Sequence, residues 1–151
     1  MPDSTEDTQE HIRKVQARLQ EAISNLTIRA AYHDRSKLAE PEKSVLDAKA
    51  GALGELRYGT AEYAAALAAV DMQPFLAHHY AHNDHHPQHY QDGVNGMSLL
   101  AILEMLADWK AAGERVKEGS MAQSLEVNKG RFGLSDQLYA IIVNTARELG
   151  W

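Results

Sequence analysis

Apolar residues recur at intervals of three and four along most of the chain, which is the spacing of amphipathic helices. In the first predicted helix, which begins at Thr8, one face carries the apolar residues Ile12, Val15, Leu19, Ile23 and Leu26. Ser24 and Asn25 favour helix caps over helix interiors, so we expect a break there before a second helical piece. That second piece leads into the pair His33-Asp34.

Proline and hydroxyl residues divide the rest of the chain into further helices, since proline favours the first turn of a helix and serine or threonine caps it. The predicted segments are Pro41–Leu56, Ala61–Val70 after Thr60, Pro74–His82, Ser98–Ala112 before Gly113, Ser120–Arg131 and Ser135–Leu149. No alternating strand pattern, repeat or low-complexity tract interrupts them. We therefore predict an all-α fold, a compact single-domain bundle of roughly six to eight helices over residues 8–151, preceded by a disordered tail over 1–7.

Composition narrows the chemistry. The chain has 151 residues, no cysteine and a formal net charge of −6. Without thiolates, a metal must be held by imidazole and carboxylate, which suit Mn, Fe, Co, Ni or Zn. The acidic charge argues against general nucleic-acid binding, which needs a basic surface. The longest apolar run, 64–70, is too short to cross a membrane, and the polar start lacks the apolar core of a signal peptide, so we expect a cytoplasmic protein.

Six of the eight histidines lie in the segment from His78 to His89. Neutral imidazole is the commonest protein metal ligand, and it also titrates near neutral pH. The cluster therefore has three interpretations: a metal site, a pH-sensitive surface or a solvated tract. Of the neighbours His78 and His79, we expect only one to point inward. His82 and His89 are expected to lie at the surface or behind the ligands.

The carboxylate that favours the metal interpretation is Asp108. Its predicted helix places leucine and isoleucine on one side, whereas Asp108 shares the other side with Glu104 and small residues. Two carboxylates at positions i and i+4 repel each other by roughly a few tenths of a kcal/mol unless a cation lies nearby. A metal ion or a buried histidine would supply that cation.

Taken in chain order, the candidates are His11, His33 with Asp34, His79, His85 with His86, and Asp108. This order resembles the HD superfamily of metal-dependent phosphohydrolases, which has a first His, an adjacent His-Asp pair, further histidines and a final Asp. The resemblance implies an HD-domain-like helical fold with one or two divalent transition-metal ions per chain. It implies that the first ion is held by His11, His33, Asp34 and Asp108. A second ion, bridged by Asp34, would be held by His79, His85 and His86.

Two shorter segments are similar to the HD-GYP branch of that superfamily. The segment from His33 to Lys37 is similar to its His-Asp-x-x-Lys motif, whose lysine faces a substrate phosphate. His85-His86 and the later Asp92-Gly93 turn are similar to its His-His segment and Asp-Gly-x-Gly turn. Two extra residues precede the turn here, and the branch's Tyr-Pro ending is absent. This departure argues against a cyclic-dinucleotide substrate.

The chain is also similar, over nearly its whole length, to a family of small uncharacterised proteins of phages and bacteria. The matching segments are His33-Asp34-x-Ser36-Lys37, Asn83-x-His85-His86-Pro87, Glu104-Met105-x-x-Asp108-Trp109 and Asn128-x-x-Arg131-Phe132. This resemblance supports the fold and the site positions but implies no substrate. We expect Lys37 and Arg131 to hold a phosphate, and Glu104 to orient a ligand or accept a proton.

His11 and His33 are 22 residues apart, and one continuous helix would separate them by about 33 Å. His11 therefore serves as a ligand only if the helix breaks at Ser24-Asn25.

Three functions fit these residues. The first is a metal-dependent phosphohydrolase acting on a nucleotide or another small phosphoester, with a homodimer left open. The second keeps the fold and the ligands but is a di-iron oxygenase that cleaves C–C or C–P bonds. The third is a non-catalytic, phage-type helical binding protein whose histidines hold a structural metal, which would close the coordination shell.

Overall fold

The computed structural model describes residues 3–54, 56, 60–115 and 119–151. Within these ranges the chain forms seven α-helices, three short 3₁₀ turns and no strand, so the all-α prediction is confirmed. The α-helices are α1 (Thr5–Tyr32), α2 (Glu42–Leu53), α3 (Ala61–Ala69), α4 (Gln73–His82), α5 (Leu99–Glu114), α6 (Met121–Phe132) and α7 (Asp136–Glu148). The 3₁₀ turns are η1 (Arg35–Leu38), η2 (Pro87–His89) and η3 (Gly93–Gly96).

Helix α1 is one unbroken helix of 28 residues, so the predicted break at Ser24-Asn25 is wrong. The Ser24 hydroxyl donates to the Gln20 carbonyl oxygen at 2.8 Å, and the Asn25 amide donates to the Glu21 carbonyl oxygen at 3.0 Å. Such bonds to the preceding turn satisfy a cap-forming side chain without ending the helix. The helix also starts at Thr5, earlier than the predicted end of the tail.

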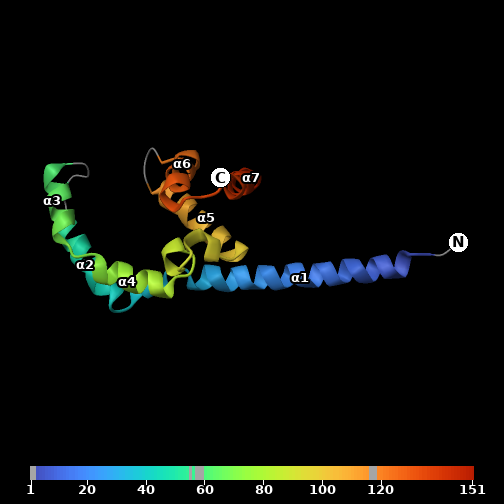
Figure 1. Cartoon of the computed structure of the whole chain (residues 1–151). Coiled ribbons are helices and arrows are strands. Elements are labelled where there is room, and N and C mark those ends of the chain that lie inside the picture. The colour runs from blue at the N-terminus through green and yellow to red at the C-terminus, as the bar shows by residue number, and fades with distance from the viewer. Residues whose placement is uncertain (1–2, 55, 57–59, 116–118) are drawn as a thin grey trace.

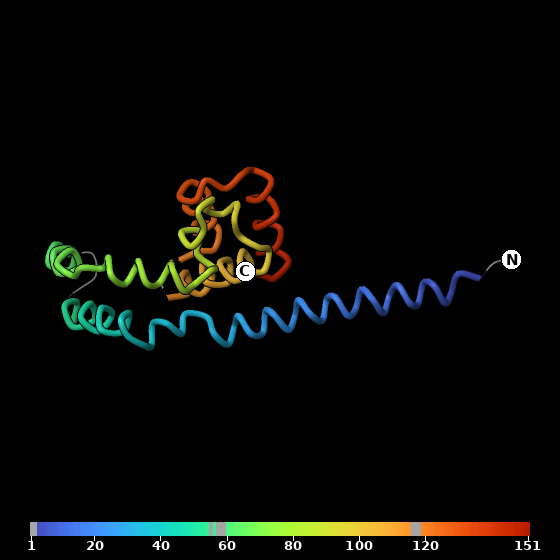
Figure 2. The backbone as a smooth tube through the Cα atoms, turned by 60° about the horizontal axis from the view of Figure 1, so that its bottom comes forward, coloured from blue at the N-terminus to red at the C-terminus, as the bar shows by residue number. Residues whose placement is uncertain are grey.

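The N-terminal half of α1 projects beyond the rest of the molecule (Figures 1 and 2). No residue of this helix is buried, and its apolar stripe is largely exposed, with Leu19 60% accessible. Its C-terminal end, in contrast, packs beside α5. The end of α1 that contacts the rest of the molecule is therefore its C-terminal end.

The hydrophobic core lies among α5, α6 and α7. Met105 and Leu106 of α5 pack with Ile142 of α7, and each is 1% exposed. Trp109 stacks on Phe132 of α6 with ring centroids 5.8 Å apart. Ser135 caps α7 as predicted, and serines cap the other two helices as well: Ser98, Ser120 and Ser135 each accept a hydrogen bond from the backbone N–H three residues later. This rigid unit presents α5 to the end of α1.

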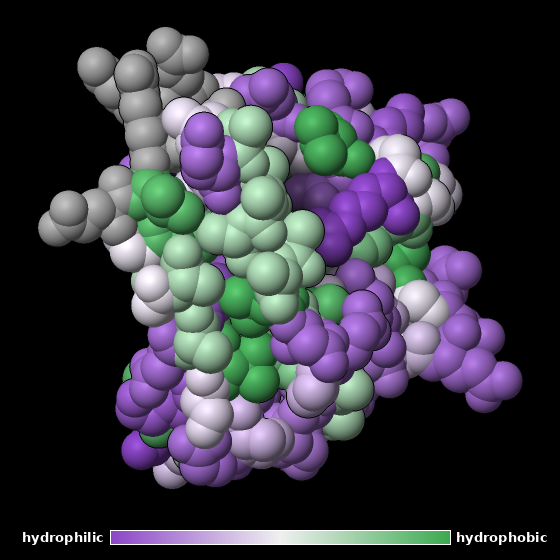
Figure 3. All heavy atoms as spheres, turned by 90° about the vertical axis from the view of Figure 1, so that its left-hand side faces the viewer, coloured by the Kyte–Doolittle hydropathy of each residue, from purple (hydrophilic) through white to green (hydrophobic). Residues whose placement is uncertain are grey.

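A second group of helices extends the molecule on the other side. Helix α4 lies beside α2, and α3 joins them at the far end (Figures 1 and 2). Thr60 caps α3 as predicted, by accepting from the Tyr63 N–H at 3.2 Å. Seen from this end, apolar side chains form a band between polar ones (Figure 3). Among the described residues, no helix is both long and apolar enough to cross a membrane.

Candidate metal centre

Histidine and carboxylate side chains converge where the end of α1, the end of α4 and the middle of α5 meet. Helix α1 ends at Tyr32, and the next residue, His33, leaves the helical conformation at φ −48° and ψ 125°. Asp34 follows with φ 54°, in the left-handed region that aspartate tolerates better than most residues. This sharp turn keeps His33 beside α5 and directs Asp34 toward α4, so one dipeptide serves two groups of ligands.

The first group consists of His33, Asp34 and Asp108. His33 Nε2 lies 3.5 Å from Asp34 Oδ2 and 3.7 Å from Asp108 Oδ1. Both His33 and Asp108 remain partly exposed, each with 29% of its side chain accessible. This group therefore borders solvent.

The second group consists of Asp34, His79, His85 and His86. The other carboxylate oxygen, Asp34 Oδ1, lies 3.4 Å from His79 Nε2 and 3.6 Å from His85 Nε2. His79 Nε2 and His86 Nε2 are 2.9 Å apart. Because the two oxygens of Asp34 belong to different groups, Asp34 joins them.

These separations fit ligands of a common ion. Imidazole nitrogen and carboxylate oxygen bind first-row ions at about 2.0–2.2 Å, which places neighbouring ligand atoms about 3.0–3.5 Å apart. Two buried atoms in the second group, Asp34 Oδ1 and His85 Nε2, have no hydrogen-bond partner in the described structure. A buried polar atom without a partner costs about 1–3 kcal/mol, so a cation between them would remove a real penalty. The donor set therefore fits a pair of divalent ions that share Asp34.

Two further carboxylates lie behind the histidines. Glu42, which is fully buried, accepts from His79 Nδ1 at 2.9 Å and from His78 Nδ1 at 2.8 Å. Glu104 accepts from His33 Nδ1 at 2.9 Å, and its same oxygen lies 3.2 Å from His85 Nδ1. An ionised carboxylate only accepts, so the proton sits on Nδ1 and Nε2 faces the site. Such carboxylate–histidine pairs are the usual support of metal-binding imidazoles.

Arg29 fixes Glu104 in turn. Its guanidinium donates to Glu104 Oε2 at 2.7 Å and makes a two-bond pair with Asp84 at 2.8 and 2.7 Å. Glu104 is 11% exposed, with Arg29 at one carboxylate oxygen and both His33 and His85 at the other. Its position supports the orienting role expected from the sequence rather than proton transfer.

The pKa values of the histidines differ between the two groups of candidate ligands. The Asp108 carboxylate, outweighing burial and helped by Glu104, raises the pKa of His33 to about 9. Hydrogen bonding to His33 lowers the pKa of Asp108 in return. Burial lowers the pKa of His85, and it lowers the pKa of His86 to about 4, so both imidazoles are neutral near pH 7, which is the protonation state that binds metals. Burial alone would raise the pKa of Asp34, but the Lys37 ammonium holds it below its usual value.

Comparison with protein families assigns the chain to a family but not to an activity. The model of DUF5662, a family of unknown function, matches residues 2–148. The chain belongs to this family. No curated protein and no solved structure matches it, and nothing in these comparisons connects this DUF5662 protein to the HD superfamily.

The structure of this DUF5662 protein brings six of the seven predicted metal ligands together. The exception is His11, which lies exposed on the unbroken helix α1, about 33 Å along the helix from His33. Its assignment as a ligand is wrong, because the helix has no glycine or proline to bend it back. Of the His78/His79 pair, His79 faces the site and His78 supports Glu42 from outside.

The remaining predicted residues divide in the same way. Lys37 makes an ion pair with Asp34 Oδ2 at the edge of the site. His82 and His89 are exposed, as expected, and each contacts a backbone carbonyl. Arg131, which was predicted to hold a phosphate, lies over the Phe132 ring at 4.8 Å and lines a separate hollow beside Gly113. No contact in the described structure joins it to the ligands.

Sequence reasoning missed Glu42 and Arg29. Glu42 follows Pro41 in the first turn of α2, where an acidic residue is ordinary, so nothing local marks it as buried. Arg29 lies four residues before His33, close to one helical turn, and that spacing is the signal that was available. Both act behind the ligands, and both depend on which helices pack together.

Proposed function

We propose that this protein is a metal-dependent phosphohydrolase that acts on a small phosphoester with two divalent ions joined by Asp34. The observation that carries the proposal is the pair of partnerless buried atoms, Asp34 Oδ1 and His85 Nε2, within a set of Nε2 atoms held by carboxylates. A site built only for hydrogen bonding would not leave these two atoms unsatisfied.

The candidate ligands divide between two ions. The first would be held by His33, Asp34 and Asp108, and the second by Asp34, His79, His85 and His86. Such ions would lower the pKa of a bound water and polarise the phosphoryl oxygen. The overall reaction adds the oxygen of water to phosphorus and breaks the P–O bond to the organic group, which leaves as an alcohol carrying a proton.

Openness of the first group supports catalysis over a structural role. Three protein atoms form it, and two of its residues are 29% exposed, so positions remain for water and substrate. His79 and His85 of the second group are 3% and 2% exposed. A structural site would be closed on all sides.

Among the basic residues that the structure describes, Lys37 is the one best placed to meet a phosphate. Its ammonium contacts Asp34 Oδ2, and 37% of its side chain is exposed. A lysine at this edge can turn toward a substrate anion while staying beside the bridging carboxylate. Arg29 is already bound to two carboxylates, so it holds Glu104 in place.

The test compares metal content and hydrolysis in single variants. Untagged protein purified without added metal should contain one or two first-row ions per chain by elemental analysis, as the ligand set requires. It should hydrolyse members of a panel of phosphoesters in Mn, Co, Ni or Mg. Asp34→Asn and Asp108→Asn should lose metal and activity, with Asp34→Asn the more severe because it serves both ions. His89→Ala, outside the ligand set, is the control and should keep both.

Two results would refute the proposal in different ways. Wild-type metal content in both asparagine variants would show that the ligands are wrongly assigned. Bound metal without hydrolysis of any ester would show that the reaction class is wrong. In that case, aerobic and anaerobic incubation of the iron-loaded protein would test the oxygenase alternative.

A further inference from the structure

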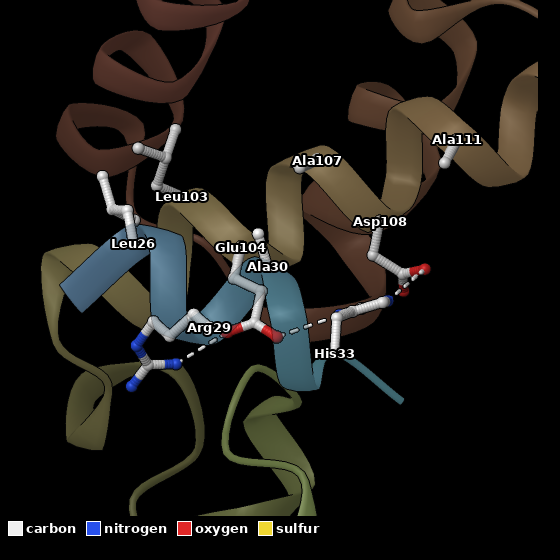
Figure 4. A pocket seen from close by; sticks show the side chains of 9 residues that line it. All are labelled: Leu26, Arg29, Ala30, His33, Leu103, Glu104, Ala107, Asp108 and Ala111. Carbon is white, nitrogen blue, oxygen red and sulfur yellow. Dashed lines mark hydrogen bonds and ion pairs between the residues drawn. The ribbon is translucent and has the colours of Figure 1, made fainter. Parts of the chain in front are cut away.

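A cavity of about 430 Å³ lies between α1 and α5, directly beside the first group of ligands. One wall carries Leu26 and Ala30 of α1, and the other carries Leu103, Ala107 and Ala111 of α5 (Figure 4). The residues on each wall are four apart, so each helix presents a continuous row of aliphatic groups. The small alanines leave the space between the two helices unfilled.

Charge is confined to one side of this cavity. His33 lies between Glu104 and Asp108, and the three line its polar side (Figure 4). Arg29 is the one Lys or Arg residue among the described residues that line the cavity, and its guanidinium is held by Glu104 and by Asp84. The aliphatic part therefore offers no free cation to a second phosphate and no polar group to a sugar hydroxyl.

We infer that this cavity receives the organic group of the substrate and that this group is apolar. The inference rests on the proposed function and deepens it: the substrate is the phosphomonoester of an aliphatic or aromatic alcohol, with its phosphate at the His33–Asp108 end. Sugar hydroxyls or a polyphosphate would lose hydrogen bonds to water against the alanine and leucine walls. An alkyl or aryl group loses none and gains contact with both helices.

Alkyl phosphates of increasing chain length measure this preference, because the acidity of the leaving alcohol and the charge of the ester stay nearly constant along the series. With metal-loaded protein, kcat/KM should rise up to about fourfold for each methylene from ethyl to octyl phosphate, the factor expected for burying one methylene. Glycerol phosphate, a polar ester of similar size to propyl phosphate, should be the poorer substrate of the two. Equal kcat/KM values along the series, with metal bound and esters hydrolysed, would overturn the inference while leaving the phosphohydrolase in place.

Filling the cavity provides the matched variant. Ala107→Leu places a larger side chain in the α5 wall and keeps a good helix former. It should abolish the gain for octyl phosphate and change ethyl phosphate less than about twofold, with metal content unchanged. Ala112→Leu, on the same helix but outside the cavity, should behave as wild type. Equal loss for both esters, or an equal effect of the control, would contradict the inference.

Binding without metal tests the cavity independently of any hydrolysis. The probe is 1-naphthol, added to metal-free protein and followed by its fluorescence. We expect saturable binding that Ala107→Leu weakens at least tenfold and Ala112→Leu leaves unchanged. If 1-naphthol does not bind, or binds the Ala107→Leu variant equally well, the cavity does not take an apolar group. Absence of metal from the wild type would instead refute the proposed function alone.

Discussion

Replacing Glu42 with glutamine should weaken both the fold and the metal site, although the residue touches no ion in the proposed arrangement. Glu42 is fully buried and accepts from the Nδ1 atoms of His78 and His79. Glutamine keeps the shape but has one acceptor oxygen and an amide donor in place of the second. One of the two Nδ1–H groups then faces another donor, and the buried imidazole of His79 loses its charged partner.

The magnitude follows from these contacts. A hydrogen bond to a charged group contributes about 1.5–3 kcal/mol, so metal-free Glu42→Gln should lose about 2–3 kcal/mol of unfolding free energy at pH 7. Loss of the carboxylate behind a ligand histidine should also weaken metal binding by about 10- to 100-fold. Burial alone would raise the pKa of Glu42, but its hydrogen bonds hold it below the ordinary value of 4.5. Its contribution is therefore present above pH 4.5 and is lost as the pH falls through the lowered pKa.

The assay is urea unfolding of metal-free wild type and variant at pH 7 and near pH 3, with metal titration calorimetry at pH 7. The difference in unfolding free energy should be large at pH 7 and should narrow at the lower pH. Glu114→Gln, which breaks an exposed pair with Lys110, should change stability by less than about 0.5 kcal/mol. If Glu42→Gln matches this control in both stability and metal affinity, Glu42 does not support His79.

Two further predictions concern pH and the long helix. Because the pKa of His33 is raised to about 9, its protonation stabilises the fold fully below pH 6.5, and this stabilisation is lost as the pH rises through 9. The melting temperature of metal-free protein should therefore fall between pH 6.5 and 9. The rise in melting temperature caused by adding metal should become larger over the same range. This prediction is contradicted if neither the melting temperature of metal-free protein nor its rise on adding metal differs between pH 6.5 and 9. Leu106→Ala should cost about 3–4 kcal/mol in urea unfolding, since it empties a core position, whereas Leu19→Ala should cost less than about 0.5. If Leu19→Ala causes a large loss of unfolding free energy, or if it lowers the molecular mass measured by light scattering relative to wild type, the apolar stripe of α1 is buried in a homodimer.

Features set by local signals could be predicted from the sequence. Helical periodicity and hydroxyl caps predicted the all-α fold, and Thr60 and Ser135 cap the helices they were expected to cap. The order of histidines and aspartates gave most of the candidate ligands, because imidazole and carboxylate are the only strong metal ligands in a chain without cysteine. His33 and Asp34 could be identified because they are adjacent in the sequence.

Features set by tertiary packing could not be predicted from the sequence. Ser24 and Asn25 have side chains suited to ending a helix, but each bonds back to its own helix, and the surrounding helix formers decide the outcome. The burial of Glu42 depends on α2 lying against α4, and that pairing leaves no mark on the residues next to it. The cavity beside His33 likewise exists because the small side chains of Ala30, Ala107 and Ala111 leave space between α1 and α5.

The left-handed turn at Asp34 sets narrow limits on which sequences this fold accepts at position 34. Only glycine, asparagine and aspartate adopt that backbone conformation readily, and of these only aspartate provides an anionic oxygen to each group of ligands. Glutamate keeps the charge but strains the turn, and asparagine keeps the turn but loses the charge. In a library of all substitutions at position 34, selection for stability should therefore retain three residues, and selection for bound metal should retain one.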